Sequence, residues 1–110
     1  MKHGELLGSL EYIILLALAR LDGPGHGMRV LQEIEERTGR RISIGAVYAT
    51  LERLEKKKYV SSFTGVPTPE RGGRAKRFFE MKPAGKRALE VSEQTLRSMT
   101  AGLKSRWGTI

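Results

Sequence analysis

The chain has 110 residues, a length typical of a single domain. Cysteine is absent, which excludes disulfides, catalysis by a thiol and metal sites built from thiolates. The 20 lysines and arginines outnumber the 12 acidic residues, and the net charge of +8 favours a polyanionic partner, either nucleic acid or an anionic membrane face.

A wide stripe of apolar residues predicts the first helix. Apolar side chains recur at three- and four-residue steps from Leu6 to Leu21, Ser9 can cap the helix, and the turn sequence 22–25 ends it. Its longest apolar run, residues 12–19, is well short of the roughly 20 residues that a membrane span needs. No signal-peptide pattern is visible either, so we expect a cytoplasmic protein that does not bind a membrane. Because the stripe is wide, we also expect this helix to contact a second subunit.

Two more amphipathic helices, joined by a short turn, predict a helix-turn-helix. The second helix runs over about residues 26–37, and Gly39 suits the left-handed residue that closes a helix. Ser43 can cap the third helix. The residues expected to point into the core are Met28, Leu31 and Ile34 of the second helix and Val47, Leu51 and Leu54 of the third.

A basic hairpin is predicted directly after the third helix. Residues 59–64 and 75–81 are rich in the aromatic and β-branched residues that strands prefer. The segment 65–74 between them is too long for a tight turn, and residues 41–80 carry a net charge of +5 whereas residues 1–40 carry −1. Three helices, a strand, a basic loop and a second strand predict a winged helix over residues 1–82, of the α+β class and mainly α.

Residues 83 to about 107 predict one long C-terminal helix, with Pro83 in its first turn. Leu89, Leu96 and Leu103 repeat every seven residues, and so small a domain cannot bury that seam alone. We therefore expect residues 83–110 to pair with the same helix of a second subunit in a homodimer. The residues expected at the interface are Leu10, Ile14, Leu89, Leu96, Met99, Leu103 and Trp107.

Five stretches of sequence, residues 6–16, 26–28, 42–57, 69–79 and 83–89, together resemble the PadR-type transcriptional regulators in their short form, which has a single C-terminal dimerisation helix. The resemblance implies a dimeric bacterial repressor that binds a pseudo-palindromic operator in double-stranded DNA. It also implies release from DNA by a small, often aromatic, effector bound near the dimer interface, where Trp107, Met99 and the first helix could line an apolar site.

Three positions depart from the pattern of this family. His26 stands where tyrosine is frequent, Lys58 where glycine is common after the third helix, and Lys82 where threonine often precedes the last helix. A lysine in the left-handed conformation costs about 1 kcal/mol. Lys82 is also a weaker N-cap than threonine. These departures concern local geometry and leave the helix-turn-helix sequence unchanged.

In helix-turn-helix proteins, the N-terminal residues of the second helix of the pair lie against base edges in the major groove. Few of the residues at these positions can make a bidentate contact with a base, so we expect DNA shape to supply much of the specificity. Tyr48 could instead be packed under the hairpin. The residues expected to bind DNA are Ser43, Gly45, Ala46, Tyr48, Ala49, Thr50 and Arg53 of the third helix and Arg71, Arg74, Lys76 and Arg77 of the wing.

No set of residues suggests catalysis or a bound cofactor, and we expect the protein not to be an enzyme. The glycine-rich sequence 23–27 follows a helix instead of a strand, so it is interpreted as a turn and not as a phosphate-binding loop. His3 and His26 lie 23 positions apart without a cysteine nearby, so we expect no metal site. His26 is expected to pack or to hydrogen-bond at the start of the second helix.

Two other functions remain open from the sequence. The winged helix could be a protein-interaction module that binds its partner through the third helix, although a protein partner does not need four cations on one hairpin. It could also be an architectural protein that binds nucleic acid without regard to sequence. Binding to a specific duplex, with and without excess random DNA, separates these functions from the first.

Overall fold

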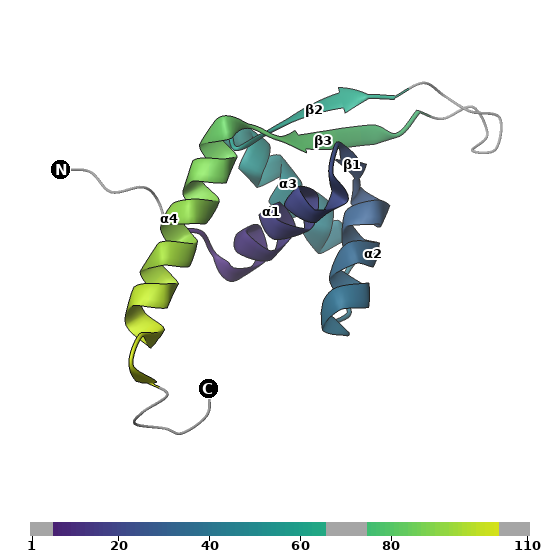
Figure 1. Ribbon diagram of the computed structural model, residues 1–110. Helices are drawn as coiled ribbons and strands as arrows, with labels where there is room; N and C mark the ends of the chain where they lie inside the picture. The colour runs from purple at the N-terminus through teal and green to yellow at the C-terminus, as the bar shows by residue number, and fades with distance from the viewer. Residues whose placement is uncertain (1–5, 66–74, 104–110) are drawn as a thin grey trace.

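The computed structural model describes residues 6–65 and 75–103, which contain four helices and three short strands (Figure 1). Three helices precede an antiparallel hairpin and a fourth helix follows it, which confirms the predicted winged helix of the mainly helical α+β class. Within the described ranges, no helix combines the length and the apolar character that crossing a membrane requires. The elements are α1 (Ser9–Leu21), β1 (Gly25–His26), α2 (Gly27–Thr38), α3 (Ile44–Lys56), β2 (Val60–Thr64), β3 (Arg77–Met81) and α4 (Pro83–Thr100).

The strands form one antiparallel sheet in the order β1-β3-β2. β2 and β3 make the hairpin, with Thr64 at the end of β2 opposite Arg77 at the start of β3. β1 adds two residues to the other edge of β3 and places Gly25 opposite Phe79. The sequence predicts only a turn at this position, because so short a strand is fixed by a partner far along the chain and leaves no local pattern.

One hydrophobic core fills the space between α1, α2, α3 and the inner face of the sheet. Phe79 of β3 and Ile14 of α1 have no exposed surface there. The predicted inward position of Met28 is wrong: its side chain is 47% exposed, because the buried stripe of α2 runs through residues 27, 30, 31 and 34. The other predicted core positions of α2 and α3 are confirmed: Leu31, Ile34, Val47, Leu51 and Leu54.

The start of α1 differs by one residue from the prediction. Gly8, and not Ser9, is the N-cap, and the Glu11 side chain accepts a hydrogen bond from Gly8 N at 3.0 Å. One residue earlier, Leu7 N donates to Ser92 Oγ of α4 at 3.1 Å. The segment before α1 is therefore fixed both to its own helix and to the last helix.

The predicted start and closing glycine of α2 and the predicted cap of α3 are confirmed. His26 Nδ1 accepts a hydrogen bond from Arg29 N at 3.2 Å and so caps α2, which is the structural role expected of this histidine. Gly39 closes α2 in the left-handed conformation with a φ of 71°. Ser43 Oγ accepts from Ala46 N at 3.1 Å and caps α3.

α4 packs on the domain over its first half only. Leu89 and Ser92 are buried, whereas every residue from 93 to 100 is exposed, and this second half projects beyond α1 (Figure 1). The prediction of one helix to about residue 107 is wrong, because α4 ends at Thr100 and Gly102 takes a left-handed φ of 82°. Trp107 lies outside the described residues.

Two of the residues predicted at the dimer interface belong to the core of their own protomer. Ile14 is 0% exposed and Leu89 is 7% exposed, so both are already covered and the prediction for them is wrong. Leu10 is partly buried against the same core. Leu96 and Met99 of α4 are 47% and 74% exposed and remain open to a partner.

Candidate nucleic-acid interface

The first turn of α3 is open to solvent, and after the exposed Ile44 it carries small side chains. Ser43, Gly45 and Ala49 are exposed, and Ala46 is half-buried. Within the described part of the chain, nothing lies within 4 Å of the position that a Cβ on Gly45 would take. The interior therefore does not require glycine at position 45, and the absence of a side chain there leaves room for a molecule outside the protein.

Two predicted contact residues of α3 face the protein. The structure corrects the prediction for Thr50, which is 2% exposed and therefore cannot offer its hydroxyl to a phosphate. Tyr48 is half-buried, with its ring on the start of α2 and its centre 6.3 Å from that of Phe79. A Cβ on Gly27 would lie 2.5 Å from this ring, so glycine at position 27 makes room for the tyrosine. Tyr48 packs under the sheet, and its contact with DNA stays a prediction.

Two arginines that the sequence analysis did not single out lie directly before α3. Arg40 and Arg41 are exposed in the turn of the helix-turn-helix, next to the cap residue Ser43. Arg40 N donates to Thr38 Oγ1 at 3.0 Å, which holds the turn in place. The sequence could have predicted them from their position alone. A cation just before the second helix of a helix-turn-helix lies beside the groove that this helix enters.

Arg53, the arginine of α3, is tied to a buried carboxylate of α1. Glu11 is 5% exposed, and its Oε2 accepts hydrogen bonds from Lys57 Nζ at 2.9 Å and from Arg53 Nε at 3.3 Å. Burial alone would raise the pKa of Glu11, but the hydrogen bonds from Lys57, Gly8 and Arg53 and the charge of Lys57 outweigh it, so the pKa is lowered. This network fixes α3 on α1.

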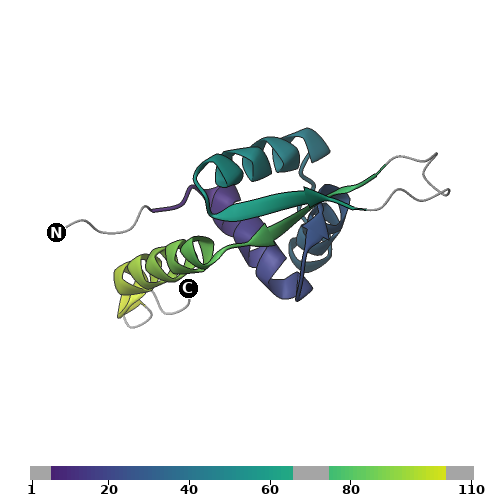
Figure 2. The same ribbon diagram turned by 90° about the horizontal axis from the view of Figure 1, so that it is seen from above.

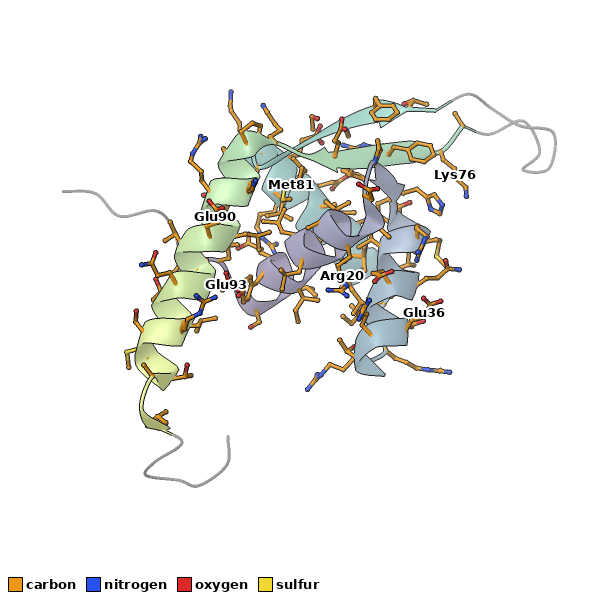
Figure 3. The ribbon with its side chains drawn as sticks, in the orientation of Figure 1. Arg20, Glu36, Lys76, Met81, Glu90 and Glu93 are labelled. Atoms are coloured by element: carbon orange, nitrogen blue, oxygen red, sulfur yellow. The ribbon has the colours of Figure 1, made fainter. Side chains whose placement is uncertain are left out.

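Lys76 and Arg77, where β3 begins, already contact other side chains of the same chain. Lys76 Nζ lies 3.0 Å from His26 Nε2, and the Lys76 side chain stands at the start of β3 (Figure 3). Arg77 pairs with Glu52 and Glu55 of α3. Arg71 and Arg74 of the predicted wing fall outside the described residues, so their predicted contacts are untested.

The comparisons with known proteins agree with this geometry. Residues 14–91 match the model of the PadR-like family of transcriptional regulators. This chain belongs to that family. Over 80 residues, 73% of the chain, it is 39% identical to a 37.1 kDa protein in transposon TN4556 of Streptomyces fradiae, of which it spans 21%.

Solved structures of PadR-type proteins share the fold. A PadR family regulator from Clostridium difficile matches with a TM-score of 0.72 and 20% identity, over 91% of this chain and 98% of that one. Bacillus subtilis PadR in complex with operator DNA matches with a TM-score of 0.65 and 20% identity, over 76% of this chain and 46% of that one. At these identities the similarities establish the winged-helix fold.

The face of this PadR-like chain that lies away from α3 carries a groove with both apolar and charged lining residues. In the view from above, α3 and α4 lie on opposite sides of the hairpin (Figure 2). On the α4 side, a groove of about 240 Å³ separates α1 from α4 and is lined by Tyr12 and Leu16 of α1, and by Met81, Glu90 and Glu93 (Figure 3). Leu16, 42% exposed, stands at the edge of this groove.

Proposed function

We propose that the protein is a dimeric transcriptional repressor that binds a pseudo-palindromic operator with α3 in the major groove and the wing on the neighbouring backbone. The observation that carries the proposal is the exposed first turn of α3, where Gly45 leaves open space and Arg40 and Arg41 stand beside it. Small residues let a helix approach base edges closely, and flanking cations bind phosphates. Bacillus subtilis PadR, which has a similar fold, has been solved in complex with operator DNA and supports DNA as the partner.

The proposed dimer contact is the second half of α4. Leu89, Ser92, Leu96 and Met99 lie on one face of α4. Leu89 and Ser92 are buried, whereas Leu96 and Met99 are exposed. A stripe that is covered in one half of a helix and bare in the other is typical of a subunit contact. Pairing through α4 leaves the α3 surfaces of both protomers free, because α3 lies on the other side of the hairpin (Figure 2).

We also propose that a small aromatic effector acts at the groove between α1 and α4. The groove of about 240 Å³ is lined by apolar residues that include Tyr12, Leu16 and Met81, and it lies beside the proposed dimer contact. A compound that binds there releases DNA only if it binds the free dimer more tightly than the DNA-bound dimer.

The test begins with selection of a duplex from a random-sequence pool by the wild-type protein. Binding of the selected duplex is then measured by fluorescence anisotropy with and without excess scrambled duplex. Selective binding is the expected result. Binding that random competitor abolishes would establish the architectural function instead, and no binding to any duplex at low salt would leave the protein-interaction module.

A designed variant ties the result to α3. Gly45→Asp places a carboxylate in open space, so we expect the fold to persist and the affinity for the selected duplex to fall about 100-fold through repulsion of phosphates. Gln94→Asp adds the same charge on α4, away from α3, and is the matched control, with binding unchanged. Equal reductions of affinity in the two variants would contradict the placement of DNA on α3.

A further inference from the structure

The side chain of Arg77 contacts four groups, two on α3 and two on the hairpin itself. Its Nη2 lies 2.5 Å from Glu55 Oε1 and its Nη1 lies 3.4 Å from Glu52 Oε2, both on α3. Its Nε donates to Ser62 Oγ of β2 at 3.3 Å, and Ser62 Oγ in turn donates to Glu55 Oε2 at 2.6 Å. The guanidinium carbon also stands 4.9 Å from the ring centre of Phe79. One side chain therefore connects α3, β2 and β3.

This connection lies at the end of the hairpin where the wing loop leaves it. Arg77 is the first residue of β3 and faces Thr64, the last residue of β2. The other end of the hairpin is held independently, by the buried Val60 and by the hydrogen bond from Lys82 N to Tyr59 O at 2.9 Å. The side chain of Arg77 is thus placed to set the direction of the hairpin without being required for its formation.

Resting on the proposed function, we propose that Arg77 is a positioning residue that fixes the angle between the wing and α3, and through this angle determines selectivity between DNA sequences. The residue type alone predicts phosphate binding for Arg77. In the structure, three nitrogens of its guanidinium are within reach of Glu52, Glu55 and Ser62. A planar guanidinium can hold several acceptors in fixed directions, which a lysine ammonium cannot do.

The angle matters because α3 and the wing must reach DNA at the same time. If the hairpin turns relative to α3, contacts in the groove and contacts on the backbone can no longer form together on one duplex. Arg77 has a second effect, since it offsets the charges of Glu52 and Glu55 on the helix proposed to face DNA. An unpaired carboxylate at either position would repel phosphates.

Arg77→Lys separates positioning from phosphate binding, because lysine keeps the positive charge but not the planar fork. Affinities are measured for the selected duplex and for a scrambled duplex, each over a range of salt concentrations. We expect the preference for the selected duplex to fall about tenfold, because the hydrogen bonds of the network break together, with the salt dependence unchanged. Circular dichroism melts establish that the variant remains folded.

Glu55→Gln removes the acidic partner of the same ion pair. If Arg77 acts through Glu55, this variant also has a weaker preference for the selected duplex, although it removes a negative charge near DNA. Glu80→Gln is the matched control, since Glu80 is exposed on β3 and makes the same change of charge outside the cluster. We expect Glu80→Gln to keep the wild-type preference.

A different set of results would overturn the inference while leaving the proposed function in place. If Arg77 binds a phosphate, Arg77→Lys keeps the preference, Glu55→Gln strengthens binding, and Arg77→Gln lowers the slope of log affinity against log salt by about 0.9 for each phosphate that is no longer bound. If the wild-type protein selects no duplex at all, the proposed function fails instead.

Discussion

Glu11 is the one buried carboxylate among the described residues. It accepts hydrogen bonds from Gly8 N, from Arg53 of α3 and from Lys57 directly after α3. Its pKa is lowered: burial acts to raise it, but the hydrogen bonds from Lys57, Gly8 and Arg53 and the charge of Lys57 prevail. A carboxylate with a lower pKa in the folded state than in the unfolded state stabilises the fold above the unfolded pKa. That contribution disappears as the pH falls through the folded pKa.

We therefore predict that Glu11→Gln lowers the free energy of unfolding by about 1–3 kcal/mol at neutral pH, because Lys57, Arg53 and Gly8 N no longer have a charged acceptor. The difference from the wild type persists down to the ordinary pKa of glutamate, about 4.5, and shrinks below it. Urea unfolding between pH 7 and pH 3 measures it. A difference that stays constant over this range would show that folding does not shift the pKa of Glu11.

Lys58 holds a backbone conformation that suits glycine better. Its φ is 68°, in the left-handed region, at the turn between α3 and β2. We predict that Lys58→Gly raises the free energy of unfolding by up to about 1 kcal/mol, because a side chain in this region is strained. Chemical denaturation measures the change. The control, Lys56→Gly in the last turn of α3, destabilises by about 1 kcal/mol, since glycine weakens a helix.

At the scale of residues, the sequence predicts local hydrogen bonding better than it predicts distant partners. The cap at Ser43 and the closing glycine at position 39 follow from neighbours in the chain and are confirmed. Thr50 and Arg77 fit DNA contacts by residue type, but Thr50 is buried and the acidic partners of Arg77 lie on α3. The residue type indicates which partners a side chain can bind, but the fold determines which partners lie within its reach.

At the scale of elements, α4 presents a continuous stripe that its own domain covers only in part. Its seven-residue spacing predicts burial of Leu89 and Leu96 alike, yet Leu89 is 7% exposed and Leu96 is 47% exposed. The spacing identifies a buried face but not the molecule that buries it. The same limit explains why the stripe of α1 wrongly predicts a subunit contact for Ile14, although the domain's own core covers this residue completely.

We predict that Leu96→Asp raises the dissociation constant of the dimer at least about 100-fold, because an unpaired carboxylate in an apolar contact costs several kcal/mol. Affinity for the selected duplex falls with it, by about 10²–10⁴, since the two half-sites are no longer bound by linked protomers. Sedimentation velocity measures the dimer. Gln94→Asp, on the opposite face of α4, keeps both properties, and a monomeric Leu96→Asp variant with full affinity for DNA would contradict the proposed assembly.

At the scale of the whole molecule, the surfaces proposed for DNA and for the second subunit are divided between two faces. The net charge is −1 for residues 1–40, +5 for residues 41–80, which hold α3 and the hairpin, and +4 for residues 81–110. α4, which carries the exposed Leu96 and Met99 and lines the groove together with α1, lies on the other side of the hairpin from α3 (Figure 2). A dimer formed through α4 therefore gathers the basic surfaces of two chains without covering them, and its charge is available to a polyanion.

This division predicts a steep dependence of DNA affinity on salt. A dimer that neutralises about 6–10 phosphates releases their counterions, so its affinity falls by about 10³–10⁵ between about 50 and 200 mM salt. Replacing Arg40 and Arg41 by alanine reduces the slope by about 0.9 for each phosphate that is no longer bound, on selected and scrambled duplexes alike, because phosphates carry no sequence. Anisotropy titrations at several salt concentrations measure both effects. A flat response in the wild-type protein would mean that the basic face does not meet the DNA backbone, and a slope that changes on one duplex only would assign the two arginines to base contacts.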